Sequence, residues 1–173
     1  GLKSSYRRRL IIREIFPLAT KVYNCLPGVA VDIDDRGCLS IDAPRISDTI
    51  IHTNDIVHLI DSKSFEWLGR WDNIINSGGI KLQPEPIEEV LKTAIDTPFF
   101  VAGIPDKTLG DALVLIQEGE GNNHVVDAKE KILFESVGLS KYQIPKKIFY
   151  LPNFVRTETK KIQRRETLDL LNF

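Results

Sequence analysis

A short basic stretch near the C-terminal end holds the side chains best suited to charge chemistry. Residues 156–164 read RTETKKIQR, with two adjacent lysines, Lys160 and Lys161, inside a run of threonines and arginines. A lysine carries a compact ammonium on a flexible stem, and such a group can neutralise negative charge in a transition state. Taken alone, the pattern favours a plainer interpretation, a solvated basic run before a C-terminal helix.

A second group of small and charged residues lies in the middle of the chain. Residues 67–89 read WLGRWDNIINSGGIKLQPEPIEE. The paired glycines Gly78 and Gly79 predict a hairpin turn between strands at 73–76 and 80–82, because such turns need positive φ. A helix is expected to begin near Pro84, where a proline costs no hydrogen bond. From pattern alone this is a solvated hairpin that leads into an amphipathic helix.

The elements before this stretch read as β-structure. Val29, Val31 and Ile33 alternate with Ala30 and Asp32, which is typical of a strand with one buried face. Strands at 50–53 and 56–60 are expected to bracket a turn at 54–55. Five short strands between residues 22 and 68 suggest a small barrel or sandwich.

The elements after it alternate between helices and strands. Helical spacing of apolar residues predicts helices at 85–95 and 127–137, the second with Ala128, Ile132, Leu133 and Val137 facing inward. Apolar runs predict buried strands at 98–104, 112–117 and 148–151, and residues 118–123 read as a polar loop without chemistry. The whole chain is therefore expected to be α+β, with a β-rich part followed by a few-stranded sheet covered by helices.

Composition narrows the classes of function. The 173 residues carry a formal net charge of −1, so nothing in the overall charge points to nucleic acid or a membrane surface. No apolar run approaches the roughly 20 residues of a membrane span. Two cysteines without metal or redox spacing fit a reduced, cytoplasmic setting, and no metal site is expected. The basic segment 1–16 reads as an anion-binding helix or a solvated end.

The order of residues in the central stretch resembles the hinge motif of the adenylate-forming superfamily. The matching pattern runs Gly69-Arg70-x-Asp72, then INSGG at 75–79, Lys81 and Ile87-Glu88. This superfamily holds acyl-CoA synthetases, nonribosomal adenylation domains and luciferases, and the motif opens their small, mobile C-terminal domain. The phrase at 75–81 is most similar to the 2-succinylbenzoate–CoA ligases of menaquinone biosynthesis.

The resemblance implies roles for individual residues. Asp55, in a Thr-Asn-Asp triplet where the family has Thr-Gly-Asp, is implied to hold the ribose hydroxyls of ATP, and Arg70 to contact the ribose. Asp72 is implied to be the hinge. The turn with Gly78 and Gly79 is implied to line the pantetheine tunnel for CoA, with Lys81 near the CoA phosphates. Asn54 replaces the family glycine, and asparagine tolerates positive φ better than other non-glycine residues.

The C-terminal basic stretch also resembles a superfamily motif. The family reads Pro-Arg-Thr-x-Thr-Gly-Lys-Ile-x-Arg, and its lysine is the adenylation catalyst. Counting from both sides places that lysine at Lys161, while Val155 replaces the proline and Lys160 the glycine. A Leu-x-x-Tyr-x-x-Pro match at 139–145 lies upstream of it, and the hinge motif lies further upstream at the distance the family has.

These resemblances predict a domain organisation and a reaction. Residues 1–68 are expected to be the end of the large adenylation domain, 69–72 the hinge and 73–173 the mobile C-terminal domain. The implied reaction is carboxylic acid plus ATP to acyl-adenylate, then CoA to a thioester, with Mg²⁺ accompanying ATP. A Ser/Thr/Gly-rich phosphate loop is not found in these residues, so we expect them not to adenylate a substrate alone.

Two other interpretations stay open at this point. A ligase that loads the acyl group onto a carrier protein would share every motif named above. The other is a non-enzymatic, free-standing interaction domain, in which the hinge sequence would be vestigial and would no longer act as a hinge. Release of the acyl-adenylate by CoA separates the first from a CoA ligase, and a phosphate loop upstream in the gene product excludes the second.

Overall fold

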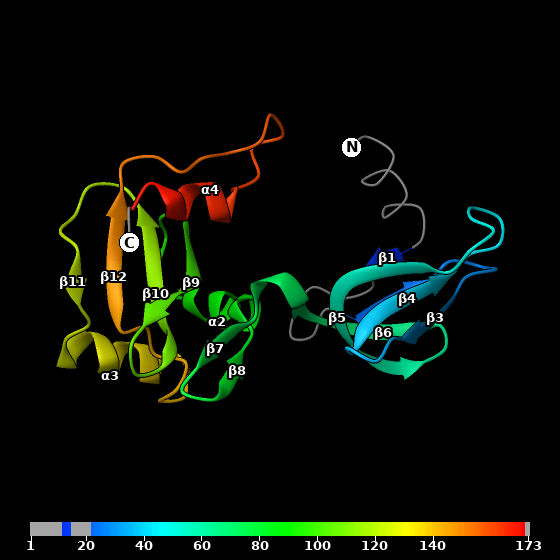
Figure 1. Ribbon diagram of the computed structural model, residues 1–173, viewed down its shortest axis with the longest axis horizontal. Coiled ribbons are helices and arrows are strands. Elements are labelled where there is room, and N and C mark those ends of the chain that lie inside the picture. The colour runs from blue at the N-terminus through cyan, green and yellow to red at the C-terminus, as the bar shows by residue number, and fades with distance from the viewer. Residues whose placement is uncertain (1–11, 15–21, 172–173) are drawn as a thin grey trace. The chain divides into compact units, whose positions relative to one another are not determined.

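The computed structural model describes residues 12–14 and 22–171, and the chain divides into two compact units between Asp72 and Asn73 (Figure 1). Each unit has its own sheet and its own apolar core. The predicted α+β class is confirmed, with strands more extensive than helices in both units. Most of the basic segment 1–16 lies outside the described residues. Within the described part of the chain, no helix is long and apolar enough to cross a membrane.

The first unit is a six-stranded antiparallel sheet of order β1-β2-β6-β5-β4-β3. Val31 and Phe65 are buried in its core, whereas Ile33 at the end of its strand is 46% exposed. The N–H of Val31 donates to the carbonyl of Ser62 at 2.9 Å, so β3 also contacts the β5–β6 turn and the sheet curls. The described strands of this unit form one sheet, so the expected sandwich is wrong, whereas the expected small barrel stays a prediction. The strands are β1 (Ile12–Glu14), β2 (Val22–Cys25), β3 (Ala30–Ile33), β4 (Cys38–Asp42), β5 (Ile51–Asp61) and β6 (Ser64–Arg70).

The two short strands expected around residues 54–55 are one long strand, β5, so the predicted turn is wrong. The pairing of β4 with β5 is irregular between Cys38 and Ser40. Cys38 pairs with Ile56 and Ser40 pairs with His52, so β5 has more residues than β4 between these two pairs. The Thr53 hydroxyl donates to the carbonyl of Leu39 at 2.9 Å and so bonds to β4 across this irregularity. Asn54 therefore lies in a bulge and does not adopt the positive φ of a tight turn.

The second unit is built around β10, which pairs in parallel with β12 and antiparallel with β9. A hairpin of β7 and β8 joins β10 at Gly110, and β11 forms the far edge of the sheet beside β12. After the 3-10 turn η1 (Trp71–Asn73), the elements are β7 (Ile75–Ser77), β8 (Ile80–Leu82), α2 (Pro84–Leu91), β9 (Phe99–Asp106), β10 (Gly110–Glu118), β11 (His124–Val125), α3 (Ala128–Ser136), β12 (Lys147–Leu151) and α4 (Arg164–Asp169).

Both faces of β10 are covered, which explains its continuous apolar sequence. Leu113 and Leu115 pack in a core with residues of α2 and α3. Val114 and Ile116 pack in a second core with Phe154 and other residues from the segment after β12. Residues 155–163 contact this second core through Ile162, which packs against it. The expected sheet with helical cover is thus present, and it has apolar cores on both sides.

Two helix predictions need correction. Helix α2 ends at Leu91, short of the expected residue 95, and continues as a turn. Helix α3 begins after Asp127, whose carboxylate caps the N–H of Glu130, but the predicted inward face is wrong. Phe134 is the buried residue, while Ile132 and Leu133 are 66% and 47% exposed. A helix turns about 100° per residue, so burying the large aromatic ring directs Ile132 away from the core.

Candidate active site

Residues 155–163, called here the Lys161 loop, form a tight hairpin that follows β12. Arg156 and Ile162 form an antiparallel bridge, and the N–H of Thr157 donates to the carbonyl of Lys161 at 2.9 Å. The N–H of Lys160 returns to the carbonyl of Thr157 at 2.8 Å. These bonds close a three-residue loop, 158–160, of the kind that ends in a left-handed residue. Lys161 is exposed at the base of this turn, on the first residue after it.

Lys160 has the left-handed conformation that this loop requires. Its φ is 62°, and it is the only non-glycine residue with positive φ among residues 12–14 and 22–171. Glycine has this conformation without steric cost, which gives a physical reason for a glycine at this place in the resembling motif. The lysine therefore keeps the turn that a glycine would form, and the register of the neighbouring Lys161 is unchanged.

The strain at Lys160 leads to a testable stability difference. We expect Lys160→Gly to leave the free energy of unfolding unchanged or to raise it by up to about 1 kcal/mol, since relief of strain outweighs the added unfolded-state entropy. Lys160→Val should lower it by about 1–3 kcal/mol, because a β-branched residue is strongly disfavoured at positive φ. Denaturant unfolding of both variants measures this. Equal stability of the two variants would contradict the left-handed assignment.

Two arginines, Arg156 inside the Lys161 loop and Arg164 directly after it, are each bound by a carboxylate from a distant part of the second unit. Arg156 donates to both oxygens of Glu118, the last residue of β10, at 2.5 and 2.6 Å. Arg164 donates to both oxygens of Glu88 in α2, each at 2.6 Å. The Glu118 and Glu88 side chains are only 16% and 12% exposed. Forked, largely buried pairs of this kind fix the orientation of both partners.

The hydroxyl of Thr167, a fully buried residue, completes the base of the loop. It accepts from the N–H of Val155 at 3.1 Å and donates to the carbonyl of Gln163 at 2.7 Å. Glu88 and Glu118 have similar second contacts, since they accept from the N–H groups of Val101 and Phe154. The loop that carries Lys161 is therefore held at both ends, while its tip is exposed to solvent.

The Glu118–Arg156 pair makes stability depend on pH. The hydrogen bonds from Arg156 hold the pKa of Glu118 below its ordinary value, and the N–H of Phe154 acts in the same direction. Ionised Glu118 therefore stabilises the fold above its unfolded-state pKa of about 4.3, and this contribution is lost as pH falls through the lower folded-state pKa.

We expect Glu118→Gln to be less stable than wild type at pH 7, with a gap that narrows as pH falls from about 5 to 3. Glutamine keeps the shape of the side chain and does not titrate, but its NH₂ replaces one of the two oxygens that accept from Arg156, so a pH-independent loss adds to the pH-dependent one. Urea unfolding of both proteins at several pH values measures the gap. A gap that stays constant across this range would show that the carboxylate charge has no part in it.

The first unit brings Asp55 and Arg70 together. They are direct partners across the β5–β6 pair, and the Nη1 of Arg70 lies 3.9 Å from an Asp55 oxygen. The indole N–H of Trp67 points at the same oxygen from 3.5 Å. The side chain of Asp55 is 16% exposed, so it is not closed off from solvent. A carboxylate beside a guanidinium can accept from two hydroxyls while the cation donates to a neighbouring oxygen.

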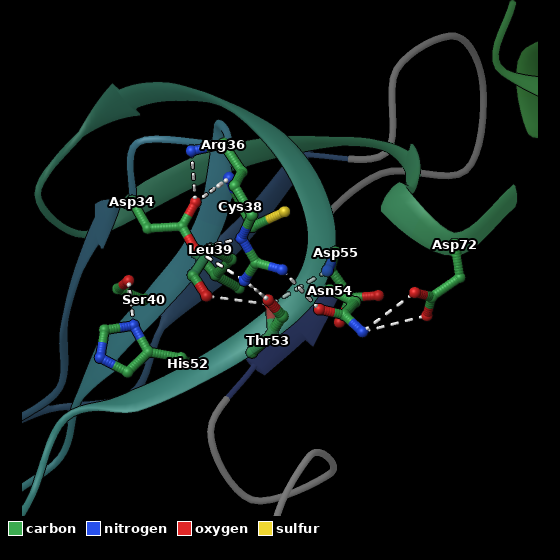
Figure 2. A network of polar contacts seen from close by, with 10 residues as sticks. All are labelled: Asp34, Arg36, Cys38, Leu39, Ser40, His52, Thr53, Asn54, Asp55 and Asp72. Carbon is green, nitrogen blue, oxygen red and sulfur yellow. Dashed lines mark hydrogen bonds and ion pairs between the residues drawn. The ribbon is translucent and has the colours of Figure 1, made fainter. Parts of the chain in front are cut away.

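Asp72 lies directly beside this pair, in the turn η1. Its carboxylate accepts from the Nη2 of Arg70 at 3.1 Å. It also accepts from the amide of Asn54 at 3.0 and 3.2 Å (Figure 2). Three of the sequence-predicted residues, Asp55, Arg70 and Asp72, thus form one polar cluster in the first unit. Lys161 and the hairpin with Gly78, Gly79 and Lys81 belong to the second unit.

No family model matches the chain. Curated proteins and solved structures do match it. The chain is 35% identical to the 2-succinylbenzoate–CoA ligase of Bacillus cytotoxicus over 133 residues. These residues are 75% of this chain and 27% of that protein. The chain is 32% identical over 118 residues to the oxalate–CoA ligase of Arabidopsis thaliana, which is 66% of this chain and 22% of that protein. The chain spans about a quarter of the length of these relatives.

Solved structures extend the match. The structure of an AMP-forming acyl-CoA synthetase-like protein from Dyadobacter fermentans aligns with a TM-score of 0.50 and 34% identity, over 90% of this chain and 45% of that one. The chain belongs to the AMP-forming acyl-CoA synthetases of the adenylate-forming superfamily. It matches a C-terminal portion of them. The o-succinylbenzoate CoA synthetase of Bacillus subtilis shares the fold, with a TM-score of 0.67 and 22% identity over 82% of this chain and 34% of that one.

The hairpin of this synthetase region has the geometry that its two glycines predict. Gly78 and Gly79 have φ of 58° and 79° and close the two-residue turn between Ser77 and Ile80. The N–H of Gly78 donates to the carbonyl of Leu109 at 2.8 Å, which fixes the turn on the β9–β10 connection. A Cβ on Gly79 would meet nothing within 4 Å, so one side of this turn is open. Lys81 follows on β8 with an exposed side chain.

Sequence reasoning missed the two carboxylates that bind Arg156 and Arg164. Glu88 enters the sequence analysis only as part of the hinge-motif match, and Glu118 only as part of the polar loop at 118–123. The available signal was the position of Glu118 at the end of a buried apolar strand, where a charge needs a partner. Among the described residues, no group of three or more His, Cys, Asp or Glu side chains could hold a metal ion.

Proposed function

We propose that this chain is the C-terminal part of an ATP-dependent, AMP-forming acid–CoA ligase. In this proposal residues 1–68 end the large adenylation domain, 69–72 form the hinge and 73–173 form the mobile domain. The observation that carries the proposal is the Lys161 loop, an exposed lysine on a turn that is anchored at both ends by buried ion pairs. The identity of over 30% to two named CoA ligases supports it.

In the first half-reaction the carboxylate of the substrate attacks the α-phosphorus of ATP, and pyrophosphate leaves. Negative charge gathers between two anions, and the ammonium of Lys161 neutralises it in the transition state. Asp55 accepts from the ribose hydroxyls and Arg70 donates to the ribose, which orients the α-phosphate. Mg²⁺ accompanies ATP in this proposal, and none of the described residues is assigned to it.

In the second half-reaction the thiol of CoA attacks the acyl carbonyl of the adenylate and AMP leaves. The Lys161 loop has no part in this step. The C-terminal domain therefore rotates about Asp72 and presents its β7–β8 hairpin to CoA. Gly78 and Gly79 give the pantetheine arm room, because they have no side chain, and Lys81 faces the CoA phosphates.

The substrate we propose is a small carboxylic acid, and 2-succinylbenzoate is the first candidate. Five further ligases for this acid, from the Bacillus cereus group of species, are 32–34% identical over 124–135 residues. Such an enzyme acts in menaquinone biosynthesis. We also propose a cytoplasmic location, since Cys25 and Cys38 are both free thiols, as expected in a reducing compartment.

The test is product analysis with the intact gene product. We expect AMP and an acyl-CoA thioester to form together from ATP, CoA and 2-succinylbenzoate, and acyl-adenylate to accumulate when CoA is left out. Oxalate, malonate and benzoate serve as comparison acids. Acyl-adenylate that a carrier protein discharges and CoA does not would replace the CoA ligase by a carrier-loading enzyme. No AMP with any acid would contradict the proposal.

A further inference from the structure

Asn54, which stands where the superfamily has a glycine, has a side chain that is bound at both ends (Figure 2). Its Nδ2 donates to the two carboxylate oxygens of Asp72 at 3.2 and 3.0 Å. Its Oδ1 accepts from the Nη1 of Arg36 at 3.1 Å. A glycine at this position could make neither contact. The replacement therefore adds a direct link from the strand β5 to the hinge residue.

Arg36, which binds the Asn54 amide, is itself held by hydrogen bonds to Asp34 and Thr53. Its Nε and Nη2 donate to the Oδ2 of Asp34 at 3.0 and 2.7 Å, and its Nη2 also donates to the carbonyl of Thr53 at 3.2 Å. The guanidinium lies 5.9 Å from the centre of the Trp71 ring, in the turn that holds Asp72. Because Arg36 has only donors, it orients the amide of Asn54 with its oxygen toward Arg36 and its NH₂ toward Asp72.

Asp72 has a second hydrogen-bond partner, Arg70, which also lies close to Asp55. Arg70 donates to Asp72 at 3.1 Å and lies 3.9 Å from Asp55, so it faces both the hinge carboxylate and the proposed ribose site. A nucleotide that draws Arg70 toward the ribose weakens its bond to Asp72. The side-chain hydrogen bonds of Asn54 go to Arg36 and Asp72, so they do not depend on Arg70 and persist when Arg70 moves. Rotation about the N–Cα bond of Asp72 moves its carboxylate and so breaks the Asn54 contact.

We propose that Asn54 is a positioning residue that holds the hinge carboxylate Asp72 and sets the balance between the two orientations of the C-terminal domain. The inference rests on the proposed function, since it takes Asp72 as the hinge. Hydrogen bonds to a carboxylate that is partly exposed change an equilibrium by roughly tenfold. Loss of the Asn54 side chain therefore shifts the two half-reactions relative to each other by a similar factor.

The test compares wild type with Asn54→Gly, Asn54→Asp and the control Asn122→Gly in the intact gene product. Asn54→Asp keeps the shape of the side chain, removes the NH₂ donor and adds like charge beside Asp72. The first measurement is trypsin cleavage after Arg70 under native conditions, which reports local opening of the hinge without any activity. We expect both Asn54 variants to be cleaved roughly tenfold faster, and Asn122→Gly to match wild type.

The second measurement is the ratio of two rates, acyl-adenylate formation and CoA-dependent consumption of purified acyl-adenylate. We expect this ratio to change at least about fivefold in both Asn54 variants, whereas a general loss of fold would lower both rates together. Unchanged cleavage after Arg70, or an unchanged ratio in an active enzyme, would overturn the inference. If the wild-type protein forms no acyl-adenylate but the Asn54 variants are still cleaved faster after Arg70, the proposed function is rejected and the Asn54–Asp72 contact is established.

Discussion

Replacing Lys161 by alanine is expected to slow acyl-adenylate formation by the intact gene product by roughly 100- to 1000-fold. The loss is large because a positioned charge that stabilises developing negative charge contributes about that much to a rate. Lys161 is exposed and outside the two buried ion pairs, so the fold should remain intact. Single-turnover formation of acyl-adenylate measures the effect. Consumption of added acyl-adenylate by CoA should be nearly unchanged.

The matched control for this experiment is Lys160→Gly. Alanine would be a poor control at this position, because the φ of 62° strains every residue with a Cβ. Glycine removes the neighbouring ammonium and preserves the turn, and we expect a rate within about twofold of wild type. If Lys160→Gly lost the activity and Lys161→Ala kept it, the register of the motif would be wrong and Lys160 would be the catalyst.

Replacing Glu88 by alanine is expected to lower the free energy of unfolding of the second unit by about 3–5 kcal/mol. The change leaves the guanidinium of Arg164 without its carboxylate partner and the N–H of Val101 without its acceptor. Burial raises the pKa of Glu88, and the hydrogen bonds from Arg164 oppose that rise. Glu88→Gln still accepts a hydrogen bond and should lose less than the alanine variant.

Hydrogen exchange of the β10 amides is the suitable measurement, because both tryptophans, Trp67 and Trp71, lie in the first unit. The control is Glu89→Ala on the same helix, where Glu89 forms an exposed pair with Lys92 at 2.7 Å. Exposed pairs contribute little, so we expect a loss of at most about 1 kcal/mol. Equal losses for Glu88→Ala and Glu89→Ala would contradict the anchoring role of the Glu88–Arg164 pair.

The local parts of this structure could be predicted from the sequence, because the interactions that form them are close along the chain. The Gly78-Gly79 turn follows from two adjacent residues that tolerate positive φ. The position of Lys161 follows from a motif of nine residues. Helix α3 was located correctly from the apolar spacing, but its inward face was not, since Phe134 takes the buried position in place of Ile132 and Leu133.

The anchors of the Lys161 loop could not be predicted in the same way. Glu88 and Arg164 are 76 positions apart, and Glu118 and Arg156 are 38 apart, so only the folded sheet brings them together. Each of these residues alone looks like an ordinary surface charge. The same holds for Asn54 and Asp72, 18 positions apart, where the sequence identified a replaced glycine but not the partner of the new side chain.

Carboxylate-dependent exchange between ATP and pyrophosphate, measured with the wild-type intact gene product, tests the central claim most directly. It reports reversible formation of an acyl-adenylate and requires neither CoA nor a carrier protein. We expect exchange that needs a carboxylic acid, with 2-succinylbenzoate among the most active acids and no requirement for CoA. Absence of exchange with every acid in a folded protein would contradict the claim that this chain is part of an adenylating enzyme.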